Sequence, residues 1–193
     1  MKRTTSAWSL VAIAACAIGL LPADSNAQNV SGQARAVQAT VASPFGITTS
    51  ILADTGTLSG PTDARDASQL TGSIGSLLSA ETLHATAIGW PDQAASEASM
   101  AGLALTIAGN TISAGFVQAR AVAGANGFRT ATIDELTING VPIDVSGAPN
   151  QTISIPGGSI VINEQQPGVV NALHIAINGV ADVVIASARA NAQ

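Results

Sequence analysis

Apolar and polar residues alternate along much of the second half of the chain, and this period of two predicts antiparallel strands. In LTINGVPIDV, branched apolar residues take every second position on both sides of Asn139 and Gly140. An Asn-Gly pair is typical of a two-residue hairpin turn, so we expect Ile138 to face Val141. The alternation predicts a sheet with one buried and one solvated face, and Pro142 indicates a strand near the sheet edge.

Two more segments repeat the hairpin pattern. In ALTIAGNTISAGF we expect a turn at Gly109 and Asn110, which leaves Phe116 on the apolar face of its hairpin. In TISIPGGSIVIN we expect a turn at Gly157 and Gly158 that gathers four isoleucines on one face.

The last hairpin is NALHIAINGVADVVIASARA. A two-residue loop would set Asp182 against Ile175, which is a poor match for a buried face. We therefore predict a three-residue loop over 178–180, which places His174 opposite Val184 and Asp182 on a neighbouring diagonal of the same face.

The first half of the chain has the same small and branched residues but weaker patterning. Residues 29–41 and 77–88 are expected to be strands. Residues 44–70 are expected to be turns with one short strand or helical turn around 65–70, and 89–99 are expected to be similar. Short strands without a long helical period predict a single all-β domain, either an antiparallel sandwich or a partly open barrel built from hairpins. A short β-solenoid is the alternative, although no regular repeat of about 20 to 50 residues is present.

The pentapeptide QARAV occurs twice, at 33–37 and 118–122. In a regular strand its Gln, Arg and Val side chains share one face, and the alanines take the other face. Counting by twos from Phe116 places Arg120 on the apolar face of its hairpin. The sequence therefore predicts either a bulge near Gly115 or a position at the sheet rim for this arginine.

The N-terminal residues have the pattern of a secretory signal. Two cations are followed by an apolar run over 10–21, and small residues precede Gln28. We expect cleavage of residues 1–27 and a secreted or periplasmic chain comprising 28–193. The run is shorter than the roughly 20 residues of a membrane span.

A second processing route is the alternative to this cleavage. Residues 13–16 spell IAAC, which is similar to the site at which bacterial lipoproteins are lipidated on a cysteine. Lipidation of Cys16 would give a membrane-anchored lipoprotein instead of a free chain.

The expected mature chain is acidic. It holds five arginines, no lysine, eleven carboxylates and no cysteine, which gives a formal charge of −6. This balance argues against nucleic acid or anionic membrane surfaces as partners, and the fold must do without disulfides. No cofactor is expected. Edge strands that lack lysine favour protein partners or self-association by strand pairing.

Four residues are the candidates for catalysis. His84 and His174 each follow a leucine inside an expected strand, Asp182 is the diagonal neighbour of His174, and Glu164 lies in the segment NEQ. An imidazole beside a carboxylate is a pattern for proton transfer or metal binding, but a half-exposed strand histidine is the commoner explanation. The chain contains no GxSxG, HExxH or phosphate-loop motif.

Asp63 and Asp66 are the candidates for a metal site. Their carboxylates lie in an expected loop and have the oxygen ligands that calcium prefers. The spacing lacks the DxDxDG pattern, so we expect a solvated loop.

The second half also resembles a known family. The strings LTINGVPIDVSGAPNQTISIPGGSIVINEQ, VNALHIAI and GVADVVIASARA follow one another in the order found in the choice-of-anchor P family of exported bacterial proteins, over residues 131–189. The resemblance implies an exported or surface-displayed domain without established activity, whose C-terminal attachment signal differs between members. Here only four residues follow Arg189, without an apolar tail or an LPxTG-like motif, which favours a free secreted chain.

The sequence as a whole favours an exported, non-catalytic structural or interaction module of the cell envelope or extracellular space. The alternative is an extracellular hydrolase or metal-dependent enzyme that uses His84 and His174 with a carboxylate.

Overall fold

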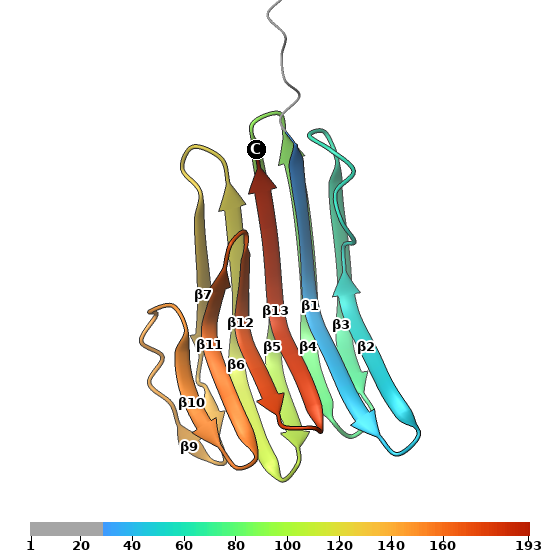
Figure 1. The fold of residues 1–193 in the computed structure, drawn as a ribbon, viewed down its shortest axis with the longest axis vertical. Helices are drawn as coiled ribbons and strands as arrows, with labels where there is room; N and C mark the ends of the chain where they lie inside the picture. Colours follow the sequence, from blue (N-terminus) through green and yellow to red (C-terminus); the bar gives the residue numbers. More distant parts are fainter. Residues whose placement is uncertain (1–28) are drawn as a thin grey trace, which may run out of the picture.

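The computed structural model describes residues 29–193, and these fold as two antiparallel β-sheets packed face to face (Figure 1). The predicted all-β sandwich is confirmed, and the sheets do not close into a barrel. The expected signal cleavage site and Cys16 lie outside the described residues. Sheet A has the strand order β10-β11-β12-β13-β1-β2, and sheet B has the order β3-β4-β5-β6-β8-β9 with β7 paired to β6.

The strands of sheet A come from both ends of the described chain. They are β1 (Val30–Ser43), β2 (Gly46–Asp54), β10 (Gln151–Ile155), β11 (Gly158–Gln166), β12 (Val169–Ile177) and β13 (Ala181–Ala192). The strands of sheet B are β3 (Ala64–Ile74), β4 (Leu78–Trp90), β5 (Gln93–Ile107), β6 (Asn110–Ala123), β7 (Phe128–Asp134), β8 (Thr137–Ile138) and β9 (Val141–Pro142). Because β1 pairs with β13, the first and last described strands lie side by side.

The core between the sheets changes character along the strands. Near the two ends of the described chain, the facing side chains are mostly alanines, such as Ala34, Ala98 and Ala188, which are fully buried. Toward the hairpin turns of β5–β6 and β12–β13, leucine and isoleucine fill the space, as at Leu105 and Ile175. Alanine lets the two layers approach closely, whereas the larger residues bury more apolar area for each residue.

A row of left-handed residues interrupts the strands of sheet A. Asn163 in β11, Ala186 in β13 and Ala53 in β2 have positive φ angles of 51°, 49° and 46°. Ladder pairing skips these positions, and the residues before and after each skip point to opposite faces. Ile185 and Ala186 are both fully buried. The inward–outward alternation therefore restarts in the opposite phase beyond the row.

A similar interruption in sheet B resolves the two copies of QARAV. Pairing of β5 with β6 skips Gly102 and Gly115, so Phe116 and Arg120 turn outward while Ala114 stays buried. The alternation does reverse near Gly115, but not through the predicted bulge, because each strand skips one residue and the register is unchanged. The placement of Phe116 on the apolar face is wrong. In the first copy the interruption falls at Ala36, so Val37 is buried and does not share the outer face of its arginine.

Two of the predicted hairpins have the expected register. Ile138 pairs with Val141 across Asn139 and Gly140, and β9, which carries Pro142, is an edge strand. The last hairpin has its three-residue loop, with His174 opposite Val184.

The other two turns lie one residue earlier than predicted. In the β5–β6 hairpin the loop is Ala108 and Gly109, and both residues have positive φ angles. Asn110 is part of the strand and not of the turn, because it is buried and donates from Nδ2 to the Pro156 carbonyl at 3.0 Å. In the β10–β11 hairpin the loop is Pro156 and Gly157. Proline suits the first central position of a type II turn and glycine the second, where φ is 79°.

The segments expected to be turns contain strands. Residues 44–70 hold all of β2, and also the first part of β3, which agrees with the strand alternative for 65–70. Residues 89–99 hold the start of β5 after a two-residue turn. Gly, Pro and Asp suggested loops here, but main-chain pairing with neighbouring strands outweighs those weak local preferences.

Candidate functional site

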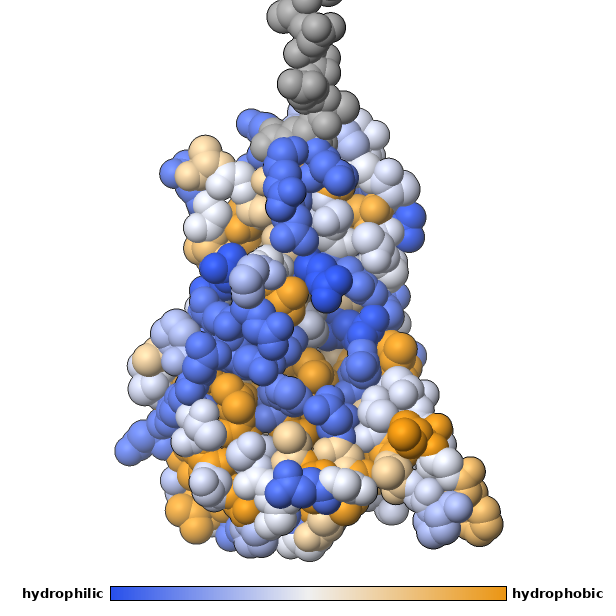
Figure 2. Space-filling view, viewed as in Figure 1, coloured by the Kyte–Doolittle hydropathy of each residue, from blue (hydrophilic) through white to orange (hydrophobic). Residues whose placement is uncertain are grey.

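Polar side chains form a row across the outer face of sheet A. Glu164, Asn171, Ser187, Arg35 and Asp54 lie opposite one another on five successive strands, from β11 to β2. Figure 2 shows hydrophilic residues over the middle of this face. The row lies directly beside the left-handed residues of sheet A.

The interruption at Asn163 explains why Glu164 belongs to this face. In a regular strand Glu164 would share the inward face of Ile160 and Ile162, which are buried. The left-handed conformation of Asn163 reverses the alternation, so the carboxylate of Glu164 points outward.

His174 lies between two carboxylates. Its Nδ1 is 3.0 Å from Oε1 of Glu164, and its Nε2 is 2.9 Å from Oδ2 of Asp182. Asn171 donates from Nδ2 to the other oxygen of Glu164 at 2.6 Å. We call Glu164, His174 and Asp182 the histidine clamp, because it joins β11, β12 and β13 through side chains.

The clamp favours a protonated imidazole. Burial alone would lower the pKa of His174, but its hydrogen bonds and charge interactions with Asp182 and Glu164 outweigh burial and raise this pKa. Burial would raise the pKa of Glu164, but hydrogen bonds from Asn171 and His174 lower it. Both ring nitrogens can donate only in the imidazolium form, and the raised pKa of His174 favours this cation between the two carboxylates.

A second ion pair joins β1 and β2 at the other end of the polar row. Arg35 donates from Nε to Oδ2 of Asp54 at 3.0 Å and also hydrogen-bonds Gln38, while Gln33 and the Gly56 amide each donate to Oδ1 at 2.9 Å. Burial would raise the pKa of Asp54, but these hydrogen bonds and the guanidinium charge lower it. The arginine of the first QARAV thus has a structural partner.

His84 lies away from the clamp, on the outer face of sheet B. Its Nδ1 is 2.8 Å from Oγ of Ser68 on the neighbouring strand β3. Because His174 lies on the outer face of sheet A, the two sheets separate the two imidazoles. The structure therefore brings together three of the four catalytic candidates, Glu164, His174 and Asp182, and leaves out the fourth.

The two aspartates proposed as metal ligands do not share a site. Asp63 accepts hydrogen bonds from the Ser59 amide and hydroxyl and from Nε of Arg65, at 2.7–2.8 Å. The amide hydrogen bond, the Arg65 donor and the hydroxyl lower the pKa of Asp63 to about 2. Asp66 lies on β3, on the face opposite to Arg65. Within residues 29–193, no three His, Cys, Asp or Glu side chains are grouped so that they could hold a metal ion.

Sequence reasoning found the neighbours His174 and Asp182 and singled out Glu164, but it missed the contact of Glu164 with His174 and the supporting residue Asn171. The contact of Glu164 with His174, and the hydrogen bond from Asn171 to Glu164, depend on the interruption at Asn163. The partnership of Arg35 with Asp54 depends on β2, a strand that was predicted as turn. An asparagine inside a β-branched strand was the available signal, because asparagine tolerates left-handed backbone better than most residues.

Comparison with known proteins adds no relative. No family model, curated protein or solved structure matches the chain. Residues 29–193 also contain no helix of the length and apolar character that crossing a membrane requires.

Proposed function

We propose that this chain is an exported, non-catalytic structural or interaction module of the cell envelope or extracellular space. The occupation of both ring nitrogens of His174 by carboxylates carries this proposal. A general base needs a ring nitrogen with a free lone pair that can reach a substrate. An imidazolium that already donates on both sides has none, so the clamp holds strands together and does not transfer protons.

Two other ion pairs have the same pattern. Arg35 and Asp54 link β1 to β2, and Arg120 on β6 lies 3.6 Å from Glu97 on β5. In each case charges on neighbouring strands of one sheet pair with one another. Cross-strand pairs of this kind stabilise a sheet and leave few charges free for chemistry.

The alternative enzyme has less support. A site containing His84 and His174 is not formed, because the imidazoles lie on opposite outer faces. The contact between Ser68 and His84 is the remaining observation that favours a hydrolase. Among residues 29–193, no carboxylate is hydrogen-bonded to His84 to orient it, as a catalytic triad requires.

A hydrolysis screen tests the non-catalytic part of the proposal. Residues 28–193 would be assayed with chromogenic esters, glycosides and peptides beside His84→Ala and His174→Ala. We expect rates equal to the buffer blank for all three proteins. Turnover by the unmodified protein that either variant abolishes would identify an active site and overturn the proposal.

Fractionation of cells that express the full chain tests export. We expect the protein outside the cytoplasm, and the signal pattern and the resemblance to the choice-of-anchor P family both support this expectation. Cys16→Ser separates the two processing routes, because it changes the fraction only if the cysteine is lipidated. Retention of the unmodified chain in the cytoplasm would contradict the proposal.

A further inference from the structure

Six hairpin turns lie together at one end of the sandwich, opposite both ends of the described chain (Figure 1). Main-chain hydrogen bonds join neighbouring turns, for example from Ala42 to Val180 at 2.8 Å and from Asn178 to Gly157 at 3.0 Å. We call this surface the turn end, and its turns are residues 44–45, 75–77, 108–109, 139–140, 156–157 and 178–180.

The turn end has almost no charge. No Asp, Glu, Lys, Arg or His occurs within three residues on either side of the first five turns. The sixth turn is followed by Asp182, which is paired with His174. The connections at the opposite end, in contrast, carry Asp63, Asp92 and Arg129 at or beside them.

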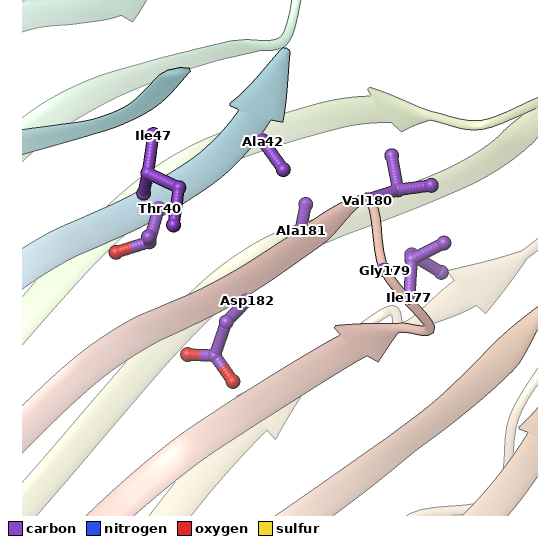
Figure 3. A pocket seen from close by; sticks show the side chains of 8 residues that line it. All are labelled: Thr40, Ala42, Ile47, Ile177, Gly179, Val180, Ala181 and Asp182. Atoms are coloured by element: carbon purple, nitrogen blue, oxygen red, sulfur yellow. The ribbon is translucent and has the colours of Figure 1, made fainter. Parts of the chain in front are cut away.

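Apolar side chains project from this surface. Phe45, at the tip of the β1–β2 hairpin, is fully exposed at 100%, Ile47 is 76% exposed and Val180 is 40% exposed. Ile47 and Val180 also line a hollow of about 430 Å³ (Figure 3). Its lining is mostly aliphatic and comes from two hairpins: Thr40, Ala42, Ile47, Ile177, Gly179, Val180, Ala181 and Asp182.

We propose that the turn end binds the turn end of a second copy of this chain about a two-fold axis, with Phe45 of each copy in the hollow of the other. A projecting aromatic ring and an aliphatic hollow lie on one surface, which makes that surface self-complementary as a two-fold interface requires. The inference rests on the proposed function, since it names the partner of a structural module.

Charge favours this end over the other surfaces. Residues 28–193 carry five arginines and eleven carboxylates, so two copies repel each other when charged faces meet. Contact through the turn end brings together surfaces whose turns are uncharged, and the nearest carboxylate there already has a cationic partner.

The size of the turn end is sufficient for a specific pair. Strands about 4.8 Å apart in sheets about 10 Å apart give an end face on the order of 30 by 20 Å, once side chains are included. Two such faces bury on the order of 1,200 Å², the lower limit of a standard interface. We therefore expect a dimer that dissociates on dilution rather than a permanent one.

Analytical ultracentrifugation over a concentration series tests the proposal on residues 28–193, which include both complete sheets. We expect a monomer–dimer equilibrium. Phe45→Ser should weaken association by about thirtyfold, as for an interface hot spot, and should leave the melting temperature of the dilute monomer unchanged, because the ring is fully exposed. Trp90→Ser is the matched control, since Trp90 is an exposed aromatic at the opposite end, and it should leave association unchanged.

Spin labels decide which surfaces meet. Residues 28–193 lack cysteine, so Ser76→Cys at the turn end and Asn126→Cys at the opposite end each provide one label per copy. End-to-end pairing gives a short distance between Ser76 labels and one on the order of 90 Å between Asn126 labels, from two strand lengths of 14 residues at about 3.3 Å each. Comparable distances at both positions would indicate pairing through edge strands and overturn the proposal.

Three further results would also overturn it: a monomer at all concentrations, a dimer insensitive to Phe45→Ser, or a monomer whose sedimentation with phosphatidylcholine vesicles depends on Phe45. The last result would identify a lipid surface as the occupant. None of these results creates catalytic turnover, so the screen for hydrolysis tests the proposed function separately.

Discussion

Replacement of His174 by leucine should destabilise the sheet in a pH-dependent way. The change removes one cation that is 24% exposed and leaves Glu164 and Asp182 without their shared donor. Loss of hydrogen bonds to charged groups at a half-buried position costs about 2 kcal/mol of unfolding free energy. For a chain of this size the melting temperature should fall by roughly 4–8 °C.

The pH dependence follows from the two directions of pKa shift. The folded-state pKa of His174 is raised above its ordinary value of 6.5, so its contribution is fully present below that pH and is lost as the pH rises through the raised pKa. The pKa of Glu164 is lowered from 4.5, so its contribution is present above that pH and is lost as the pH falls through the lowered pKa. The stability difference between wild type and variant should therefore be largest between pH 4.5 and 6.5.

Urea unfolding monitored by circular dichroism, at about pH 5.5 and about pH 9, measures this difference. His84→Leu is the matched control, because it removes a half-exposed strand imidazole that has a serine and not a carboxylate as its hydrogen-bond partner. We expect it to change stability by no more than about 0.5 kcal/mol. A difference for His174→Leu that is equal at both pH values would refute the charged clamp.

Two further predictions concern the other ion pairs and the interrupted strands. Arg35→Gln should lower the unfolding free energy by about 1–2 kcal/mol, because Asp54 loses two donors. Arg120→Gln should cost less than about 0.5 kcal/mol, because the side chain of Arg120 is 52% exposed. Equal losses of unfolding free energy in urea titrations would contradict the burial argument. Thr82→Gly should raise the melting temperature, since the exposed Thr82 has a φ of 49° and glycine relieves about 1 kcal/mol of backbone strain. Ser79→Gly, in the extended part of the same strand, should lower the melting temperature. Destabilisation by both changes would show that the left-handed conformation of Thr82 is not strained.

The sequence predicted the fold class because hairpin signals are local. The Asn139–Gly140 turn and the three-residue loop of the last hairpin need only a few adjacent residues, and both were found in the expected register. The pairing of His174 with Asp182 follows directly from that register.

The rest depends on contacts between distant segments. Four alanines and one asparagine occupy the interrupted positions of sheet A, and alanine carries no local preference for a left-handed conformation. Interruption of one strand fits only where its neighbours are also interrupted, so the row is a property of the sheet and not of any single segment. The outward position of Glu164, on which the complete clamp depends, could therefore not be predicted from a local sequence pattern.

The protonation state of His174 tests the central claim most directly. A nitrogen-15 NMR spectrum of the imidazole at pH 6.5, where an ordinary histidine is half protonated, reports each ring nitrogen separately. The structural clamp predicts that both nitrogens are predominantly protonated, with His84→Gln used to assign the signals. A predominantly neutral ring with one unprotonated nitrogen would contradict the clamp and restore His174 as a candidate base.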